Sequence, residues 1–439
     1  MWVTQFFHFS LLLFALKSVP LHPIFNMRVL IINTSERIGG AAIAANRLME
    51  ALKKNGVKAK MLVRDKQTDH LTVVPVGHNW MQPIKFVWER LCILLTNRFD
   101  RKKLFYVDIA NTGTDVTHRH EFKEADIIHL HWVNQGFLSL SDLNKIFHSG
   151  KPVVITMHDQ WYFTGVCHHA DDCTKYREMC HHCPVMNGGS LVDMAKQVFQ
   201  KKRRIYQGAR ITFVGCSQWI ANLARTSRLT QGHTVINIPN PINTDFFQHS
   251  DRQQARQHFG LPSDKHLLLF SCLRITDERK GFHYLAEAIN LINQQHPDIA
   301  RQLGIVVVGG EAEKVQSMLN TDIFPIRYVS DPQKMVQLYN AVDMFVTPSL
   351  QENLPNTIME SMACGTPCVG FNVGGIPEMI DHKENGYVVD YKNAQDLADG
   401  IIWTLRADHD TLSRLARNKV MTTYSENAVA RKYMEVYEG

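Results

Sequence analysis

The feature that most constrains this chain is the stretch from Asp343 to Glu378, DMFVTPSLQENLPNTIMESMACGTPCVGFNVGGIPE. The apolar run 344–346 predicts a buried strand, which Pro348 and Ser349 end. Pro355 suits the first turn of a helix, because its missing N–H would be unpaired there anyway. Residues 365–367, Gly-Thr-Pro, end that helix. A second apolar strand follows at 368–371, so the stretch predicts a strand–helix–strand unit.

Two carboxylates straddle the predicted strand-to-helix turn: Glu352 lies in the turn and Glu360 in the helix. Ligands of open α/β sheets bind at this carboxyl edge. A helix amino end facing the edge offers free N–H groups and a positive dipole, which suit a phosphate. The alternative is an ordinary amphipathic helix with two solvated glutamates.

Seven residues separate Glu352 from Glu360, Pro348-Ser349 precedes the two glutamates, and Ala-Cys-Gly-Thr-Pro follows them at 363–367. This pattern resembles the signature of retaining GT-B glycosyltransferases of family 4 (glycosyl transferases group 1), of the bacterial polysaccharide-biosynthesis type. The resemblance implies that Glu352 bonds hydroxyls of a donor sugar and that Glu360 bonds the ribose of its nucleotide. The family often has Gly-Phe-Gly after the first glutamate. This chain has Asn-Leu-Pro at 353–355, which leaves the shape of the sugar pocket open.

The length of 439 residues is too great for one core, so two domains are expected. The resemblance implies an α/β chain of the GT-B class, with two Rossmann-like, doubly wound parallel-sheet domains facing a central cleft. The Pro- and Asn-rich segment 235–247 resembles the family's passage between domains. The expected division is an acceptor-side domain over 27–238, a donor-nucleotide domain over 239–420 and a helix over 421–439 that crosses back.

Residues 1–26 look foreign to the rest. The apolar run from Leu11 to Leu16 has no basic residue before it, and it is too short to span a bilayer. It also makes a poor signal peptide. We interpret the segment as an upstream start, with the fold beginning at Met27; a weak membrane anchor is the alternative.

The net charge of +6 fits anionic ligands or an anionic membrane surface and does not indicate nucleic acid. Nine cysteines spread along the chain favour a reducing compartment over a disulfide framework. A cytoplasmic protein, with peripheral attachment at the inner face of the membrane as an alternative, is therefore expected.

Two places in the first half are candidates for the site. Gly39 and Gly40 join an apolar strand over 27–33 to a helix over 41–54, and such a βα turn suits a phosphate; a plain tight turn is equally favoured. His158 follows the strand over 153–157 and resembles the family's active-site histidine beside the reacting carbon. His131, which ends a strand expected over 126–132, is a weaker candidate.

Two basic stretches are open to two interpretations. Residues 80–105 mix aromatic and aliphatic side chains with basic ones, so they predict either a helix on anionic lipid or a core-packing helix with a solvated basic face. The run 201–204, Lys-Lys-Arg-Arg, predicts a solvated helix face, or a contact with acceptor phosphate or lipid.

Four cysteines crowd into a short segment: Cys167, Cys173, Cys180 and Cys183. Four thiolates around one Zn²⁺ form a closed structural site, and a neighbouring histidine could replace a thiol. A redox Cys-x-x-Cys is the alternative, although no thioredoxin-like context surrounds it. We interpret the segment as a metal-stapled loop.

In the second half, Arg274 follows a strand over 266–272, and Lys280 lies six residues further on. Two cations at a strand end can grip a diphosphate and offset charge on a leaving group, and both match the family's phosphate-holding residues. Gly309 ends a strand over 305–308. A further strand is expected over 326–330. The resemblance implies that main-chain hydrogen bonds at Val329 bind the base of the donor nucleotide.

The sequence therefore predicts a retaining transfer of a hexose-type sugar from a UDP- or GDP-sugar to a hydroxyl of a glycan or lipid-linked acceptor, in cell-surface polysaccharide synthesis, with no catalytic metal. His158, Glu352, Arg274 and Lys280 are its expected catalytic residues. Two alternatives remain open. One is a silent sugar-nucleotide-binding subunit of an assembly complex, and the other is a GT-B sugar-nucleotide epimerase.

Overall fold

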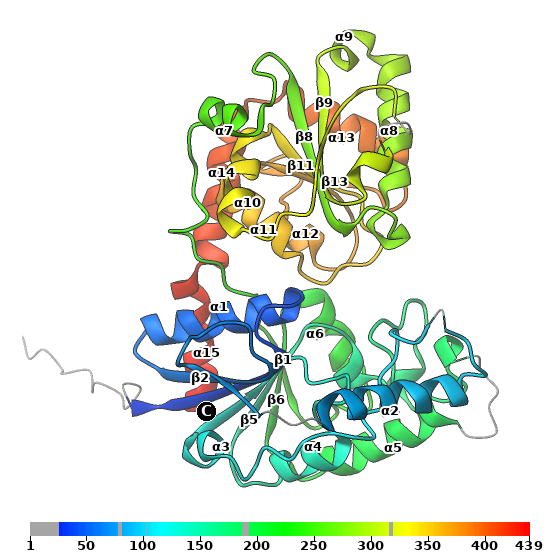
Figure 1. The fold of residues 1–439 in the computed structure, drawn as a ribbon, viewed down its shortest axis with the longest axis vertical. Coiled ribbons are helices and arrows are strands. Elements are labelled where there is room, and N and C mark those ends of the chain that lie inside the picture. The colour runs from blue at the N-terminus through cyan, green and yellow to red at the C-terminus, as the bar shows by residue number, and fades with distance from the viewer. Residues whose placement is uncertain (1–25, 78–80, 102, 187–192, 316–318) are drawn as a thin grey trace, which may run out of the picture.

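The computed structural model describes residues 26–77, 81–101, 103–186, 193–315 and 319–439. The extension expected over 1–26 thus lies outside the described residues, apart from Asn26. Two parallel sheets, each flanked by helices, form two domains stacked along the long axis of the molecule (Figure 1). This is the expected doubly wound α/β class.

The first sheet has seven strands within the described residues, in the order β3-β2-β1-β4-β5-β6-β7, and neighbouring strands pair in parallel. Residues 29–32 of β1 are all buried, as is typical of a strand covered on both faces. The strands are β1 (Arg28–Ser35), β2 (Lys58–Asp65), β3 (Val73–Pro75), β4 (Ile127–Leu130), β5 (Val153–Met157), β6 (Ile211–Gly215) and β7 (Thr234–Asn237). The helices of this domain are α1 (Gly40–Lys54), α2 (Met81–Thr96), α3 (His120–Glu124), α4 (Leu140–Phe147), α5 (Met194–Tyr206) and α6 (Gln218–Arg225).

The second sheet has six described strands in the order β10-β9-β8-β11-β12-β13, again all parallel. The strands are β8 (His266–Arg274), β9 (Leu303–Gly310), β10 (Asp322–Ile326), β11 (Met344–Thr347), β12 (Cys368–Phe371) and β13 (Gly386–Val389). The helices are α7 (Arg252–Phe259), α8 (Phe282–Gln295), α9 (Pro297–Ala300), α10 (Pro332–Ala341), α11 (Asn356–Ala363), α12 (Ile376–Met379), α13 (Ala394–Arg406) and α14 (His409–Thr423).

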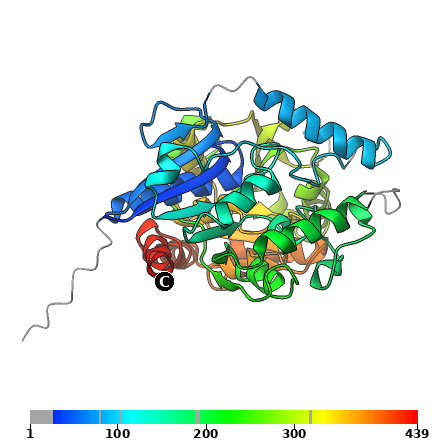
Figure 2. The ribbon, with the colours of Figure 1, turned by 90° about the horizontal axis from the view of Figure 1, so that it is seen from below.

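The last helix, α15 (Glu426–Glu438), packs against α1 in the first domain. Its residues Val429, Ala430, Tyr433 and Tyr437 belong to the same buried cluster as residues of β1 and α1. Figures 1 and 2 show this red helix beside the first sheet. The domain boundaries at 238/239 and 420/421 stay a prediction.

Three expectations about local structure are wrong. The strand expected over 326–330 instead ends at Ile326, so Val329 lies beyond it. The strand β4 ends at Leu130, and both His131 and Trp132 follow it. Lys202, expected on a solvated face, is fully buried: its Nζ donates to the Trp161 carbonyl at 2.5 Å and lies 3.5 Å from the centre of the Trp161 ring. Helical spacing did carry this signal, because Lys202 continues the buried face that Val198, Phe199 and Tyr206 form on α5.

A buried polar network joins β4 and β5 to α15. His129 Nδ1 lies 2.7 Å from the Tyr437 hydroxyl, and His129 Nε2 lies 2.8 Å from Thr156 Oγ1. Thr156 Oγ1 lies 2.7 Å from the Tyr433 hydroxyl. Burial, assisted by the nearby His158, lowers the pKa of His129 from 6.5 to about 3.

Acid should therefore destabilise the protein through His129. The unfolded side chain takes up a proton below about pH 6.5, whereas the folded one stays neutral down to about pH 3. Stability is lost as the pH falls through this window, by about 2 kcal/mol at pH 5 for this one group. We expect His129→Gln to lose less unfolding free energy between pH 7 and pH 5 in urea titrations than the parent protein. The exposed His118→Gln should keep the parent's pH dependence, and an unchanged slope in His129→Gln would contradict the assignment.

Candidate functional site

A cleft of about 860 Å³ lies between the carboxyl ends of the two sheets. In each sheet the strand order reverses at one point, between β1 and β4 in the first and between β8 and β11 in the second. Such switch points are where open α/β sheets bind ligands. Both switch points contribute to the cleft walls, through Asn33 and Thr34 of β1, Trp132 after β4, residues 270–273 of β8 and Thr347 of β11.

Two helix amino ends meet in the cleft. Helix α1 begins after Gly39, whose φ of +91° suits glycine, and Gly39 and Gly40 both line the cleft. Helix α11 begins opposite, and Asn356 Nδ2 donates to the Gly40 carbonyl at 3.3 Å. Both helices thus present unpaired N–H groups and positive dipole ends to one space, which suits a diphosphate.

Glu352 and Lys280 form an ion pair in the second-domain wall. Glu352 follows β11, and Lys280 ends a short 3₁₀ turn that begins at Glu278. Burial lowers the pKa of Lys280, but the adjacent Glu352 outweighs it, so this pKa lies above its usual value. Gly281 follows in the left-handed region at φ +67°, and a Cβ there would lie 1.9 Å from the Pro348 carbonyl oxygen. The ion pair therefore depends on a backbone contact that only glycine permits.

Glu360 bonds groups from both domains. Arg47 Nη2 of α1 donates to Glu360 Oε1 at 2.6 Å, and the Tyr339 hydroxyl donates to Oε2 at 2.9 Å. Arg47 also lies over the Phe247 ring, 5.1 Å from its centre. This carboxylate, predicted to bind ribose, is already oriented and charge-balanced before any ligand arrives.

His158 lines the cleft directly after β5 and is paired with His131. His131 Nδ1 and His158 Nε2 lie 2.9 Å apart, and one donates to the other. Burial lowers the pKa of His158 to about 4 and that of His131 well below its ordinary value. Both rings are therefore neutral at pH 7. Asn353 Nδ2 donates to the His158 carbonyl at 3.0 Å, so the loop of Glu352 reaches across the cleft to this strand end.

The structure brings Gly39, Gly40, His158, Lys280, Glu352 and Glu360 into one cleft. Three residues predicted to hold the donor do not line it, and neither does the weaker candidate His131. Arg274 is exposed at the end of β8, Gly309 is buried under the Cys272 carbonyl, and Val329 packs on the second-domain core. Their proposed contacts with a donor stay predictions.

Sequence reasoning missed three side chains of this region. Arg279 lines the cleft beside Lys280, Asn353 bridges the domains, and Arg47 pairs with Glu360. The sequence carried a signal only for Asn353, which stands where the resembled family often has glycine. Arg47 lies 313 positions from its partner, so no local pattern could join them.

The four cysteines lie near one another in the first domain, but not as a finished metal centre. Cys167 hydrogen-bonds Cys183, and the Gly165 N–H donates to Cys180 Sγ at 3.2 Å. Within the described residues no group of three or more His, Cys, Asp or Glu side chains is arranged to hold a metal ion. The structural zinc stays a prediction.

Comparison with protein-family models finds one match in each domain. Residues 38–246 match Glycosyltransferase Family 4, and residues 265–407 match Glycosyl transferases group 1. Among curated proteins, the chain is 26% identical over 216 residues to D-inositol 3-phosphate glycosyltransferase of Thermobispora bispora, covering 46% of this chain and 50% of that one. It is 28% identical over 186 residues to the putative colanic acid biosynthesis glycosyltransferase WcaL of Salmonella typhimurium, covering 39% and 44%. These matches span about half the length of each relative.

Solved structures support the fold. Sucrose-phosphate synthase of Thermosynechococcus elongatus superposes with a TM-score of 0.65 at 19% identity, covering 94% of this chain and 98% of that one. The Anabaena HepE protein in complex with UDP-glucose has a TM-score of 0.60 at 16% identity, with coverages of 94% and 99%. At these identities the likeness establishes the GT-B architecture alone.

Gly374 holds the loop that carries Glu352. Its φ is +58°, and a Cβ there would lie 1.8 Å from the Glu352 carbonyl oxygen. We expect Gly374→Ala to lower the unfolding free energy by about 2–4 kcal/mol, because left-handed strain adds to a clash that displaces the loop. Gly150→Ala is the matched control, since Gly150 has φ +82° and nothing within 4 Å of the added Cβ. Equal losses in the two variants, measured by urea denaturation, would show that the clash carries no weight.

Proposed function

We propose that the chain transfers a sugar from a nucleotide-diphosphate donor to a hydroxyl group, because models of Glycosyltransferase Family 4 and of Glycosyl transferases group 1 match its two domains in turn. The observation that carries this proposal is the cleft itself. It combines two helix amino ends, a cation at Lys280 and carboxylates at Glu352 and Glu360. Anionic diphosphate and polyhydroxyl sugar are the two chemistries that this set can bind together.

In the proposed complex, the diphosphate lies between the amino ends of α1 and α11, with Lys280 against its oxygens and Arg274 supplying further charge. Glu352 accepts hydrogen bonds from the sugar, and Glu360 accepts them from the ribose. The base lies toward Gly309 and Val329. The donor is a UDP- or GDP-sugar, and the structural neighbour HepE, whose complex contains UDP-glucose, supports the UDP form.

The bond from the sugar's anomeric carbon to the diphosphate oxygen breaks, and its electron pair leaves with the diphosphate. Lys280 and the helix N–H groups stabilise that growing charge. The acceptor hydroxyl forms the new bond on the same face, with retention, and passes its proton to the departing phosphate oxygen. His158 and Asn353 fix the loop and strand end beside the reacting carbon. Closure of the domains over the donor keeps water out.

The proposed role is transfer of a hexose-type sugar to a glycan or lipid-linked acceptor in cell-surface polysaccharide synthesis, on the cytoplasmic side. Its support is the similarity to a relative described as a putative colanic acid biosynthesis glycosyltransferase. The similarity to glycosyltransferases disfavours both a silent binding subunit and an epimerase.

A panel of UDP- and GDP-sugars should identify the donor. The correct donor binds the folded chain alone, so at 100 times its Kd it adds about 2.7 kcal/mol to stability. We expect a rise of several degrees in melting temperature for one base and sugar and smaller rises for the others. Absence of any shift across the panel at millimolar concentration would sink the proposal.

Replacing Glu352 separates function from stability. Glu352→Gln keeps the volume but removes the charge, so donor-sugar orientation is lost, and transfer should fall by about 100-fold or more. The ion pair with Lys280 is mostly buried, with Glu352 16% and Lys280 34% exposed, but the glutamine carbonyl oxygen can still accept from Lys280, so the melting temperature should fall by a few degrees at most. Glu50→Gln, which breaks a more exposed pair with Lys53 outside the cleft, is the control and should retain full turnover. Full turnover in Glu352→Gln would contradict the role.

A further inference from the structure

Helix α2 presents an apolar face to solvent. Its exposed large side chains recur at helical spacing and run for about 20 Å along one side. This α2 stripe consists of Met81, Ile84, Val87, Trp88, Leu91 and Leu95, each between 41% and 60% exposed. Contiguous exposed apolar surface of this kind marks an interaction site in a soluble fold.

The opposite side of α2 holds the helix in this orientation. Glu89 and Arg90 are buried, and Arg90 Nη2 lies 2.9 Å from Asp108 Oδ2 and 3.1 Å from Glu89 Oε2. Arg90 Nη1 also donates to the Leu104 carbonyl at 2.7 Å, and the Ala110 N–H donates to Glu89 Oε1 at 2.7 Å. The helix thus buries Arg90 with its carboxyl partners and exposes its apolar side. Turning it over would leave buried charges unpaired, which costs several kcal/mol.

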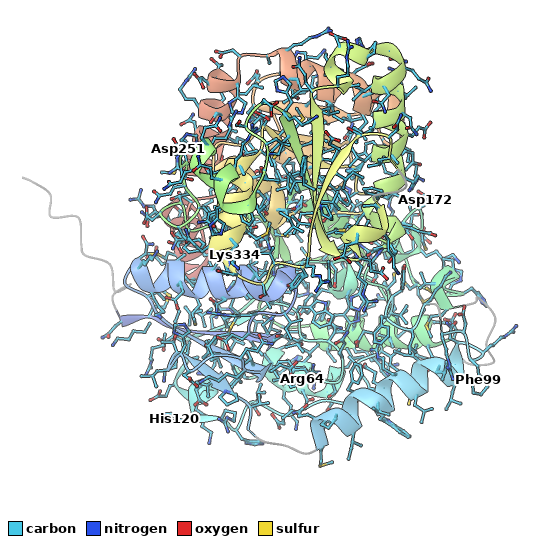
Figure 3. All side chains as sticks on the ribbon, turned by 45° about the horizontal axis from the view of Figure 1, so that its top comes forward. Arg64, Phe99, His120, Asp172, Asp251 and Lys334 are labelled. Atoms are coloured by element: carbon cyan, nitrogen blue, oxygen red, sulfur yellow. The ribbon has the colours of Figure 1, made fainter. Side chains whose placement is uncertain are left out.

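The segment after α2 extends the same surface. Phe99, Phe105 and Tyr106 are exposed, and Phe105 stacks on Phe86 of α2 with ring centres 6.4 Å apart. Figures 2 and 3 show α2 as a ridge at the edge of the molecule, and Figure 3 labels Phe99 at its far end. Apart from the buried Glu89–Arg90 pair, the described residues of 81–106 carry four cations and one acid: Lys85, Arg98, Arg101, Lys103 and Asp100.

We propose that the α2 stripe and its basic flank form a docking surface for an anionic lipid membrane. Apolar side chains enter the acyl boundary while Lys and Arg meet the headgroups, and Trp88 has the amphipathic ring suited to that depth. A second copy of this chain would bring one basic flank against another, whereas an anionic bilayer complements it. Among the described helices none has the length and apolarity to cross a bilayer.

The docking surface adjoins the cleft. Gly136 packs so closely on α2 that a Cβ would lie 3.0 Å from the Lys85 carbonyl carbon and the Phe86 nitrogen, and the preceding Gln135 lines the cleft. On the other side, the Arg279 guanidinium of the cleft wall lies 5.8 Å from the Tyr106 ring centre. When the protein is docked on a membrane, the opening of its cleft would lie at the membrane surface. The acceptor is then lipid-linked, a consequence that rests on the proposed function, whereas docking itself does not.

The test is flotation of the full chain with vesicles of phosphatidylcholine alone and with one third phosphatidylglycerol. We expect binding to the anionic vesicles, at least tenfold weaker binding to the neutral ones, and a loss of binding at high salt. Trp88→Glu combined with Leu91→Glu should weaken anionic-vesicle binding tenfold or more. Leu71→Glu is the matched control, because Leu71 is 94% exposed and lies outside the stripe. It should bind as the parent does.

Equal binding by the double variant and the parent, or equal binding to neutral and anionic vesicles, would overturn the proposal. So would light scattering that finds a dimer in the parent and a monomer in the double variant, because the stripe would then cover a second copy. The melting-temperature shift with nucleotide sugar, measured on the same variant, reports folding and donor binding separately. Vesicle binding with no melting-temperature shift from any nucleotide sugar would support docking and contradict the proposed function. A melting-temperature shift without vesicle binding would support the proposed function and contradict docking.

Discussion

The burial of α15 in the first domain is the interaction on which the rest of the structure depends. The chain leaves the second domain after α14 and places Tyr433 and Tyr437 against β4 and β5, where they bond Thr156 and His129. This contact ties the end of the chain to the first sheet, two residues before the cleft-lining His158. Glu378 adds a second tie between the domains, since its carboxylate accepts from the N–H groups of Gln218 and Trp219 at 2.7 Å. Together these contacts bring the two switch points face to face.

The cleft that results is already balanced in charge. Glu352 is paired with Lys280, and Glu360 with Arg47, each carboxylate within the space where the proposed donor would lie. A bound donor therefore replaces the ion-pair partners of these side chains, because each of them is already paired. The exchange favours a ligand that brings both anionic and hydroxyl groups, because phosphate alone satisfies Lys280 but leaves Glu352 in need of a donor.

Much of the second domain could be predicted from sequence because its signals are local. The apolar runs, Pro355 and the Gly-Thr-Pro turn specify a strand, a helix and a strand, and they place both glutamates at one sheet edge. The rest depends on contacts between distant parts of the chain. Arg47, Asn353 and the His131–His158 pair act across domains or across neighbouring strands. Helix α2 is instructive because its pattern is amphipathic either way, and only the buried Glu89–Arg90–Asp108 cluster decides which side faces solvent. Val329 was misplaced because a strand end could not be fixed by hydrophobicity.

The meeting of two helix amino ends has a consequence for turnover under the proposed function. These N–H groups and Lys280 address the diphosphate, which is the part of the donor that remains after the sugar has gone. The nucleotide product would thus keep most of its contacts with the protein and would compete with new donor for the same binding site. Release of the nucleotide, after which Arg47 and Glu360 would form their ion pair again, would then limit the turnover rate more than cleavage of the glycosidic bond does.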